Sequence, residues 1–341
     1  MNIYDTMVLI ATVENLKPPS SFLLDMFFLR TVNSDSEFVA IDVYVGKRRL
    51  APFCSPLVQG KLVEGAGFST TEFKPAYVKD RRILDPKRAV RRAIGERIGG
   101  SMSPAERAQA NLAFELADQV TMVNRRMEWM AASALSLGTV TVAGEGFETT
   151  IINFGRDAGQ TLTLSGGSRW GQSGVKPLAN IDTWATTMLK NSGLPVTDVV
   201  FTPGAWAEFV QDADLQRLLQ NTGGVLPRDI NVGPQAPQVG GQYMGSLGGY
   251  RLWKYVEWYI DPVDSVEKPM VADNTVILGS AALDGVRAFG TIMDEEHNYQ
   301  ALPYAPKSWV EKDPAVRQLL MQSAPLVIPT NVNAAFSVVV K

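Results

Sequence analysis

The stretch between Ser103 and Gly138 constrains the fold more than any other part of the sequence. Ser103 can cap the first free N–H groups of a helix, Pro104 suits the first helical position, and Glu106 completes a capping box. Gly138 can adopt the left-handed conformation that ends many helices. We therefore predict one helix over residues 104–137. At ~1.5 Å per residue it would be about 50 Å long and would span a domain as a spine.

Larger apolar side chains recur every three or four residues along this stretch, as on one face of an amphipathic helix. The stripe is formed by Leu112, Leu116, Val120, Val123, Met127, Met130, Ala134 and Leu137. The charged remainder consists of Glu106, Arg107, Glu115, Asp118, Arg125, Arg126 and Glu128. The alternative is two shorter helices broken near Asn124.

The composition of the chain limits the kinds of function that it can have. The chain has 341 residues of which 45% are hydrophobic, enough for one sizeable core or two domains. A net charge of -3 gives no overall basicity that would indicate nucleic-acid binding. Cys54 is the single cysteine, so no internal disulfide can form. We expect neither a signal peptide nor a membrane span, because the sequence has no suitable apolar run.

The single histidine, His297, limits the possible catalytic chemistry. Zinc sites usually need two or more His or Cys ligands, and a Ser-His-Asp triad would have to use His297 itself. The surrounding run 294–298 is interpreted as an acidic surface loop, with a hard-cation site from Asp294, Glu295 and Glu296 as the alternative. We expect no catalytic residue, no cofactor and no metal.

Residues 1–50 are interpreted as an arm with little core of its own, containing a helix at Asn2–Leu16 and a strand at Glu37–Val45. The apolar run 22–29 would be an aggregation hazard if it were exposed. It must therefore dock on its own domain or on another subunit. The predicted intersubunit contacts in this run are Phe22, Phe27 and Phe28.

Residues 51–80 are predicted to form a long hairpin with strands at Leu57–Glu64 and Thr70–Val78. Gly65 and Gly67 suit the positive φ angles of a tight tip. Because an isolated two-stranded ribbon is marginally stable in water, we expect this hairpin to project and to be held by a neighbouring chain. The predicted contacts are Leu57, Val58, Phe68, Phe73 and Tyr77.

Basic residues gather between Lys79 and Arg97. They could bind phosphate or an acidic protein surface, or they could form an exposed face neutralised by Asp80, Asp85 and Glu96. No aromatic residues alternate with them, as single-strand nucleic-acid binding would favour. We favour ion pairs between subunits, made by Lys79, Arg81, Arg82, Arg88, Arg91 and Arg92.

Strand, helix and Gly/Pro loop signals indicate an α/β subdomain up to about residue 300. The strands expected at Arg317–Val327 and Phe336–Val340 then return to the domain of the spine. We predict an α+β protein with one discontinuous domain. Its parts are the arm 1–50, the hairpin 51–80, the spine domain 81–173 with 301–341, and the insertion 174–300.

This order of elements resembles the major capsid proteins of tailed double-stranded DNA phages, which have the Hong Kong ninety-seven-type fold, and more narrowly the lambda-like family. The resemblance begins at about residue 20 and continues to the C-terminus. Its most specific pieces are FLLDMFFLR, CSPLV from Cys54, EFKPAYVK from Glu72, DNTVILG from Asp273, YAPKSWV from Tyr304 and MQSAPL from Met321.

The resemblance implies a peripheral domain around the spine, an axial domain at 174–300 and an extended hairpin lying on a neighbouring subunit. It implies self-assembly into pentamers and hexamers of an icosahedral head that encloses double-stranded DNA. The implied partners are a scaffolding protein, a portal and a trimeric cementing protein, with assembly in the cytoplasm of the bacterial host. Two alternatives are a nanocompartment shell that encloses a cargo enzyme and a small-molecule enzyme that uses the α/β subdomain.

Overall fold

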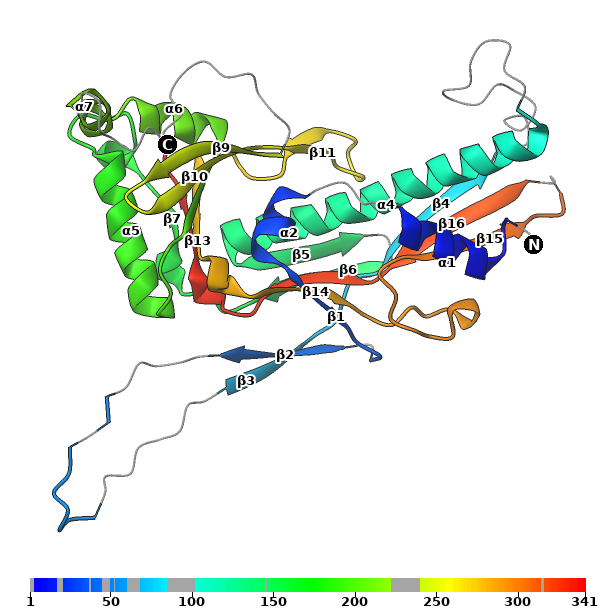
Figure 1. The fold of residues 1–341 in the computed structure, drawn as a ribbon, viewed down its shortest axis with the longest axis horizontal. Coiled ribbons are helices and arrows are strands. Elements are labelled where there is room, and N and C mark those ends of the chain that lie inside the picture. The colour runs from blue at the N-terminus through cyan, green and yellow to red at the C-terminus, as the bar shows by residue number, and fades with distance from the viewer. Residues whose placement is uncertain are drawn as a thin grey trace.

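The computed structural model describes residues 3–16, 21–36, 38–44, 50–51, 53–59, 68–84, 102–144, 146–221, 240–313 and 316–341. Figure 1 shows an elongated body with the long helix α4 along one part and a sheet flanked by helices at the other end. The hairpin formed by β2 and β3 extends away from this body (Figure 1).

Helix α4 spans Pro104–Leu137, as predicted. The side chain of Ser103 accepts from the backbone N–H of Glu106, and the Glu106 side chain accepts from the N–H of Ser103, which confirms the capping box. Gly138 ends the helix with a φ of 72°. The helix is continuous, so the alternative break near Asn124 is wrong. The predicted stripe is buried except for Leu137, which is 60% exposed.

Two three-stranded sheets lie beside α4, with strand orders β1-β14-β17 and β15-β16-β4. Strands β17 and β16 pack against the helix, and their apolar side chains share one core cluster with its stripe. The bounds are β1 Arg30–Asn33, β14 Gly285–Phe289, β17 Pro325–Pro329, β15 Ala305–Val310, β16 Arg317–Ser323 and β4 Val78–Leu84. A ribbon of β5 (Thr139–Gly144) and β6 (Phe147–Asn153) follows the helix.

A six-stranded sheet with the order β7-β18-β13-β8-β10-β9 forms the other end of the body. Helices α5 and α6 pack against this sheet around a second core cluster that contains Trp170, Trp184 and Phe336. The strands are β7 Thr161–Thr163, β18 Ala335–Val339, β13 Thr275–Gly279, β8 Asp198–Phe201, β10 Tyr250–Val256 and β9 Gly240–Leu247. The helices are α5 Pro177–Ser192, α6 Pro203–Val210 and α7 Ala213–Asn221.

The sheets do not follow the predicted division at residue 300. Strand β18, expected in the spine domain, pairs with β13 and β7 of the six-stranded sheet. Strand β14, expected in the insertion, pairs with β1 and β17 beside α4. The predicted strand Tyr250–Ile260 is divided into β10 and β11 (Trp258–Ile260), and β11 pairs with β12 (Glu267–Pro269). The chain therefore crosses between its two parts more often than predicted.

The hairpin begins earlier than predicted. Strand β2 (Val39–Tyr44) pairs with β3 (Phe68–Phe73), from Val39 opposite Phe73 to Tyr44 opposite Phe68. The expected strand at Leu57–Glu64 is corrected in its first residues, where Pro56 and Leu57 form a turn. Gly65 and Gly67 lie outside the described residues. Of the segment between these two strands, the structure describes residues 50–51 and 53–59, and these described residues are called the far part of the hairpin.

The N-terminal segment is folded onto the body. Helix α1 (Thr6–Asn15) lies against β15 and α4, and Leu9 and Val13 are buried there. Helix α2 (Phe22–Phe27) packs against α4. The described residues of this segment thus contribute to the core of the body, and of the two docking alternatives predicted for the apolar run 22–29, the structure shows docking on its own domain.

Candidate intersubunit surfaces

The far part of the projecting hairpin carries apolar side chains that nothing in the described chain covers. Phe53 is fully exposed, Leu50 and Leu57 are each 95% exposed, and Val58 is 65% exposed. Exposed apolar groups this close together typically mark a contact with another molecule. Leu57 and Val58 were predicted contacts from the sequence, and the structure leaves both available for that role.

The base of the hairpin is anchored in the body. Val39 is 1% exposed, and the ring of Phe73 lies 5.6 Å from the ring of Phe154 beyond β6. Phe73 was predicted as an intersubunit contact, but its burial gives it a role inside its own chain. Phe68 opens β3.

The aromatic residues of the arm also serve their own chain. Phe27 and Phe28 are buried, so the prediction that they contact a neighbouring subunit is corrected. Phe22 is half-buried and its ring stacks at 5.7 Å from that of Tyr255. Tyr77 is also half-buried, and its hydroxyl accepts from the backbone N–H of Met293.

The basic cluster is partly neutralised within the chain. Arg82 pairs with Asp80 at 2.9 Å, Glu115 at 2.8 Å and Asp118 at 2.7 Å, which ties β4 to α4. The pKa of Arg82 is raised by these carboxylates against the opposing effect of burial. The intersubunit role predicted for Arg82 is therefore corrected to an intrachain one.

The other basic residues predicted as intersubunit contacts are not part of the Arg82 ion-pair cluster. Lys79 and Arg81 are exposed on β4, and the Lys79 ammonium lies 5.3 Å from the centre of the Tyr77 ring. The predicted contacts Arg88, Arg91 and Arg92 lie outside the described residues. Lys79 and Arg81 remain candidates for contact with an acidic neighbouring surface.

The run 294–298 lies at the surface as predicted, with Glu295, Glu296 and Asn298 exposed, but two of its side chains are held by the body. His297 is buried, and the Asp294 carboxylate accepts from Lys307 at 3.1 Å and from Gln322 at 2.8 Å. Burial lowers the pKa of His297. The pKa of Asp294 is lowered because its hydrogen bonds outweigh its burial. Asp294 therefore joins this loop to β15 and β16, and the buried His297 lies in the same loop.

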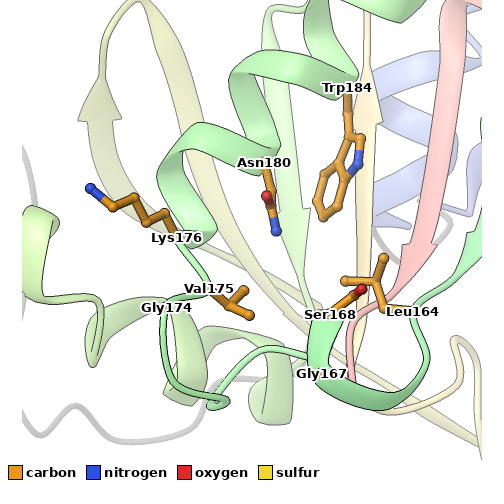
Figure 2. Close-up of a pocket in the computed structure, with 8 residues that line it drawn as sticks. All are labelled: Leu164, Gly167, Ser168, Gly174, Val175, Lys176, Asn180 and Trp184. Atoms are coloured by element: carbon orange, nitrogen blue, oxygen red, sulfur yellow. The ribbon is translucent and has the colours of Figure 1, made fainter.

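A shallow hollow of about 410 Å³ lies beside α5 (Figure 2). Asn180 and Trp184 extend from α5 toward Leu164 and Ser168, and Lys176 points away (Figure 2). Lys176 pairs with Asp214 at 2.8 Å. The lining residues are Leu164, Gly167, Ser168, Gly174, Val175, Lys176, Asn180 and Trp184. They include neither a carboxylate nor a histidine or cysteine, and Lys176, the one ionisable side chain among them, is paired with Asp214.

Two glutamates that the sequence placed in the charged remainder of α4 are buried. Glu115 and Glu128 are 8% and 1% exposed. The signal available in the sequence was spacing, since Glu128 lies four residues after Asn124 and four before Ala132, and both of those are buried. Their partners lie far away in the sequence, so the pattern of α4 alone did not identify them.

Among the described residues, no group of three or more His, Cys, Asp or Glu side chains could hold a metal ion. In the same part of the chain, no helix has the length and apolarity needed to cross a membrane.

Comparison with known proteins gives matches over nearly the whole chain. The family model described as "Phage major capsid protein E" matches residues 5–340. The major capsid protein of Escherichia phage lambda is 29% identical over 336 residues, covering 96% of each chain. That of Enterobacteria phage phi80 is 27% identical and covers 99% of each chain.

Solved structures match as well. A prophage protein of Escherichia coli CFT073, described as a capsid protein, superimposes with a TM-score of 0.75 at 20% identity over 99% of each chain. The capsid of Ralstonia phage GP4 gives a TM-score of 0.53 at 14% identity, covering 95% of this chain and 94% of that one.

Proposed function

The chain belongs to the phage major capsid protein E family, and from this premise we propose that it assembles through its projecting hairpin into the pentamers and hexamers of an icosahedral head. Its role is structural, and it is not an enzyme. The head would enclose double-stranded DNA without sequence-specific contacts. A scaffolding protein, a portal and a trimeric cementing protein would be its partners, with assembly in the cytoplasm of the bacterial host.

The observation that carries this proposal is the hairpin. Its base is anchored by Val39 and Phe73, whereas Phe53 and Leu57 are fully or almost fully exposed. Burying these side chains on a second copy would contribute about 1.5–3 kcal/mol for each large residue. Repeated around a closed shell, many such contacts add through multivalency. Each subunit would both extend a hairpin and receive one, which is a heterologous contact that can close into rings.

The family assignment, rather than the fold, favours a phage head over a nanocompartment. Particles purified after expression of the full-length chain would separate these two readings. Negative-stain electron microscopy of the protein should show closed polyhedral shells, and particles from infected cells should contain nuclease-resistant double-stranded DNA. Monomers or irregular aggregates alone would contradict the proposal, and shells that enclose an enzyme in place of DNA would favour the nanocompartment.

A further inference from the structure

Helix α2 packs against a surface of the body, called its seat, in which three positions are glycine. Each of three phenylalanine rings at the ends of α2 packs against one of these glycines. A Cβ atom on each of these glycines would come within 2.0–2.4 Å of a ring atom, which is closer than real Cβ contacts. The pairs are Phe22 with Gly241, Phe27 with Gly279, and Phe28 with Gly285. The glycines therefore leave just enough room for these rings, and any larger residue at the three positions would clash with α2.

Polar side chains of the body bind both ends of α2. At its N-terminus, the Glu128 carboxylate accepts from the backbone N–H of Leu23 at 2.9 Å and of Leu24 at 3.0 Å. At its C-terminal end, Arg287 donates to the carbonyl oxygen of Phe28 at 2.6 Å and to the Asp25 carboxylate at 2.7 Å. The charge of Arg287 has the sign that the helix dipole favours at the C-terminal end. Ser21, the N-cap residue, makes no side-chain capping bond, so Glu128 takes over that role.

The hydroxyl group of Tyr255 bridges two carboxyl groups. It donates toward Oε1 of Glu128 at 3.0 Å and toward Oε2 of Glu257 at 3.2 Å. A phenol has a single hydrogen, which the two carboxyl groups must share. Two carboxyl groups held this close to one hydroxyl repel each other when both are charged, so the geometry favours one proton on the pair.

The surroundings of the pair favour this proton. Burial raises the pKa of Glu128 to about 7, with a further increase from the nearby Glu257. Burial also raises the pKa of Glu257, against the lowering effects of Tyr255 and Arg125. The two N–H donors of helix α2 lower the pKa of Glu128 but do not outweigh its burial, and the charged residue of α2, Asp25, is paired with Arg287. Strand β10 contributes Tyr255, whose pKa is raised by burial and by the two carboxylates.

We propose that Glu128, Tyr255 and Glu257 form a proton-holding latch that keeps α2 seated on the spine helix. Release of α2 would expose Glu128 to water, where an ordinary glutamate binds its proton less tightly. The seated state therefore takes up a proton more readily than the released state, so mild acid favours seating and rising pH favours release. Loss of the shared proton leaves two carboxylates facing each other across Tyr255, which is the physical reason for release.

Amide hydrogen exchange of the full-length chain, followed by mass spectrometry on peptides from α2, tests this latch. The N–H groups of Asp25 and Phe28 are bonded to Ser21 and Leu24, so their exchange reports opening of the helix. After correction for the intrinsic effect of pH, exchange should accelerate about tenfold between about pH 6 and about pH 8. Glu128→Gln should remove this acceleration, because glutamine does not titrate.

Glu148→Gln is the matched control, since Glu148 is exposed on β6 and should leave the acceleration unchanged. If Glu128→Gln fails to fold, Glu257→Gln provides the test: its amide can donate to Tyr255 permanently, so the acceleration should shrink. A wild-type rate that does not change with pH would overturn the latch. So would slower exchange at high pH, or an acceleration that persists in both latch variants. None of these outcomes depends on shell assembly.

Discussion

Arg156 donates from Nη1 to the backbone carbonyl oxygen of Leu135 at 2.6 Å, and so closes the last turn of the spine helix from outside it. Its second terminal nitrogen donates to the carbonyl of Ser136 at 2.7 Å. These carbonyl groups belong to the final turn, where intrahelical partners run out. Burial lowers the pKa of Arg156 to about 10, so the guanidinium remains charged at neutral pH.

Arg156→Lys should therefore destabilise the subunit. A lysine ammonium cannot match the paired geometry of guanidinium, and losing one charged hydrogen bond costs about 1.5–3 kcal/mol. The free energy of unfolding, measured by denaturant titration, should fall by this amount. Arg169→Lys is the control, because Arg169 is exposed and makes only a long bond to Leu164 at 3.4 Å. Equal stability of the two variants would contradict the capping role.

Gly285→Ala should be strongly destabilising. The added methyl group would lie 2.2 Å from a ring carbon of Phe28 and 2.5 Å from the backbone oxygen of Phe27. Overpacking of this kind typically costs about 1–3 kcal/mol, because the neighbouring backbone cannot move aside freely. Thermal unfolding should show a lowered midpoint. Gly167→Ala, where nothing lies within 4 Å, should leave the midpoint nearly unchanged.

His297 should make the protein less stable in mild acid. Its pKa is lowered by burial, so between the lowered value and about 6.5 the unfolded chain binds a proton that the folded chain does not. The free energy of unfolding should therefore fall with pH below about 6.5, by at most about 1.4 kcal/mol per pH unit for this single group.

His297→Leu removes this group and should flatten that part of the pH profile, whereas Glu295→Gln, an exposed change in the same loop, should not. Glu128 has the opposite effect on the pH profile, because its pKa is raised. Its contribution to the free energy of unfolding falls as pH rises through about 7. The comparison of His297→Leu with wild type isolates the histidine. An identical pH profile in the two proteins would refute its contribution.

Aspartates at the far part of the hairpin should block assembly without unfolding the subunit. Phe53 and Leu57 contact almost nothing within their own chain, so the double variant Phe53→Asp with Leu57→Asp should keep the wild-type unfolding midpoint. Buried against a neighbour, the two charges would be strongly unfavourable. Sedimentation velocity should show small species in place of shells. Normal shells from this variant would mean that the hairpin does not carry the contact.

The sequence predicted the spine to the residue because local chemistry determines its ends. Ser103, Glu106 and Gly138 act within one turn of each helix end. The hairpin was misplaced because β2 and β3 pair across the whole loop, Val39 with Phe73, and no local signal indicates that register. The strand pairing across residue 300 was not predicted for the same reason, since β14 and β18 pair with strands far away in the sequence.

The candidate surfaces were predicted only in part. Leu57 and Val58 were identified because an apolar side chain in a polar ribbon is conspicuous. Phe27 and Phe28 are equally apolar in the sequence, but the glycines against which they pack lie more than 250 residues away. Glu128 was missed because a charged residue on a helix is usually solvated, and its partners at Leu23 and Tyr255 lie over 100 residues away on either side.

Cryo-electron microscopy of assembled shells would show directly whether the hairpin carries the contact between subunits. The reconstruction should place the hairpin of each subunit on an adjacent subunit, with the side chains of Phe53 and Leu57 covered by that neighbour. Hairpins that fold back onto their own subunit, or whose apolar side chains face solvent in a closed shell, would contradict the account.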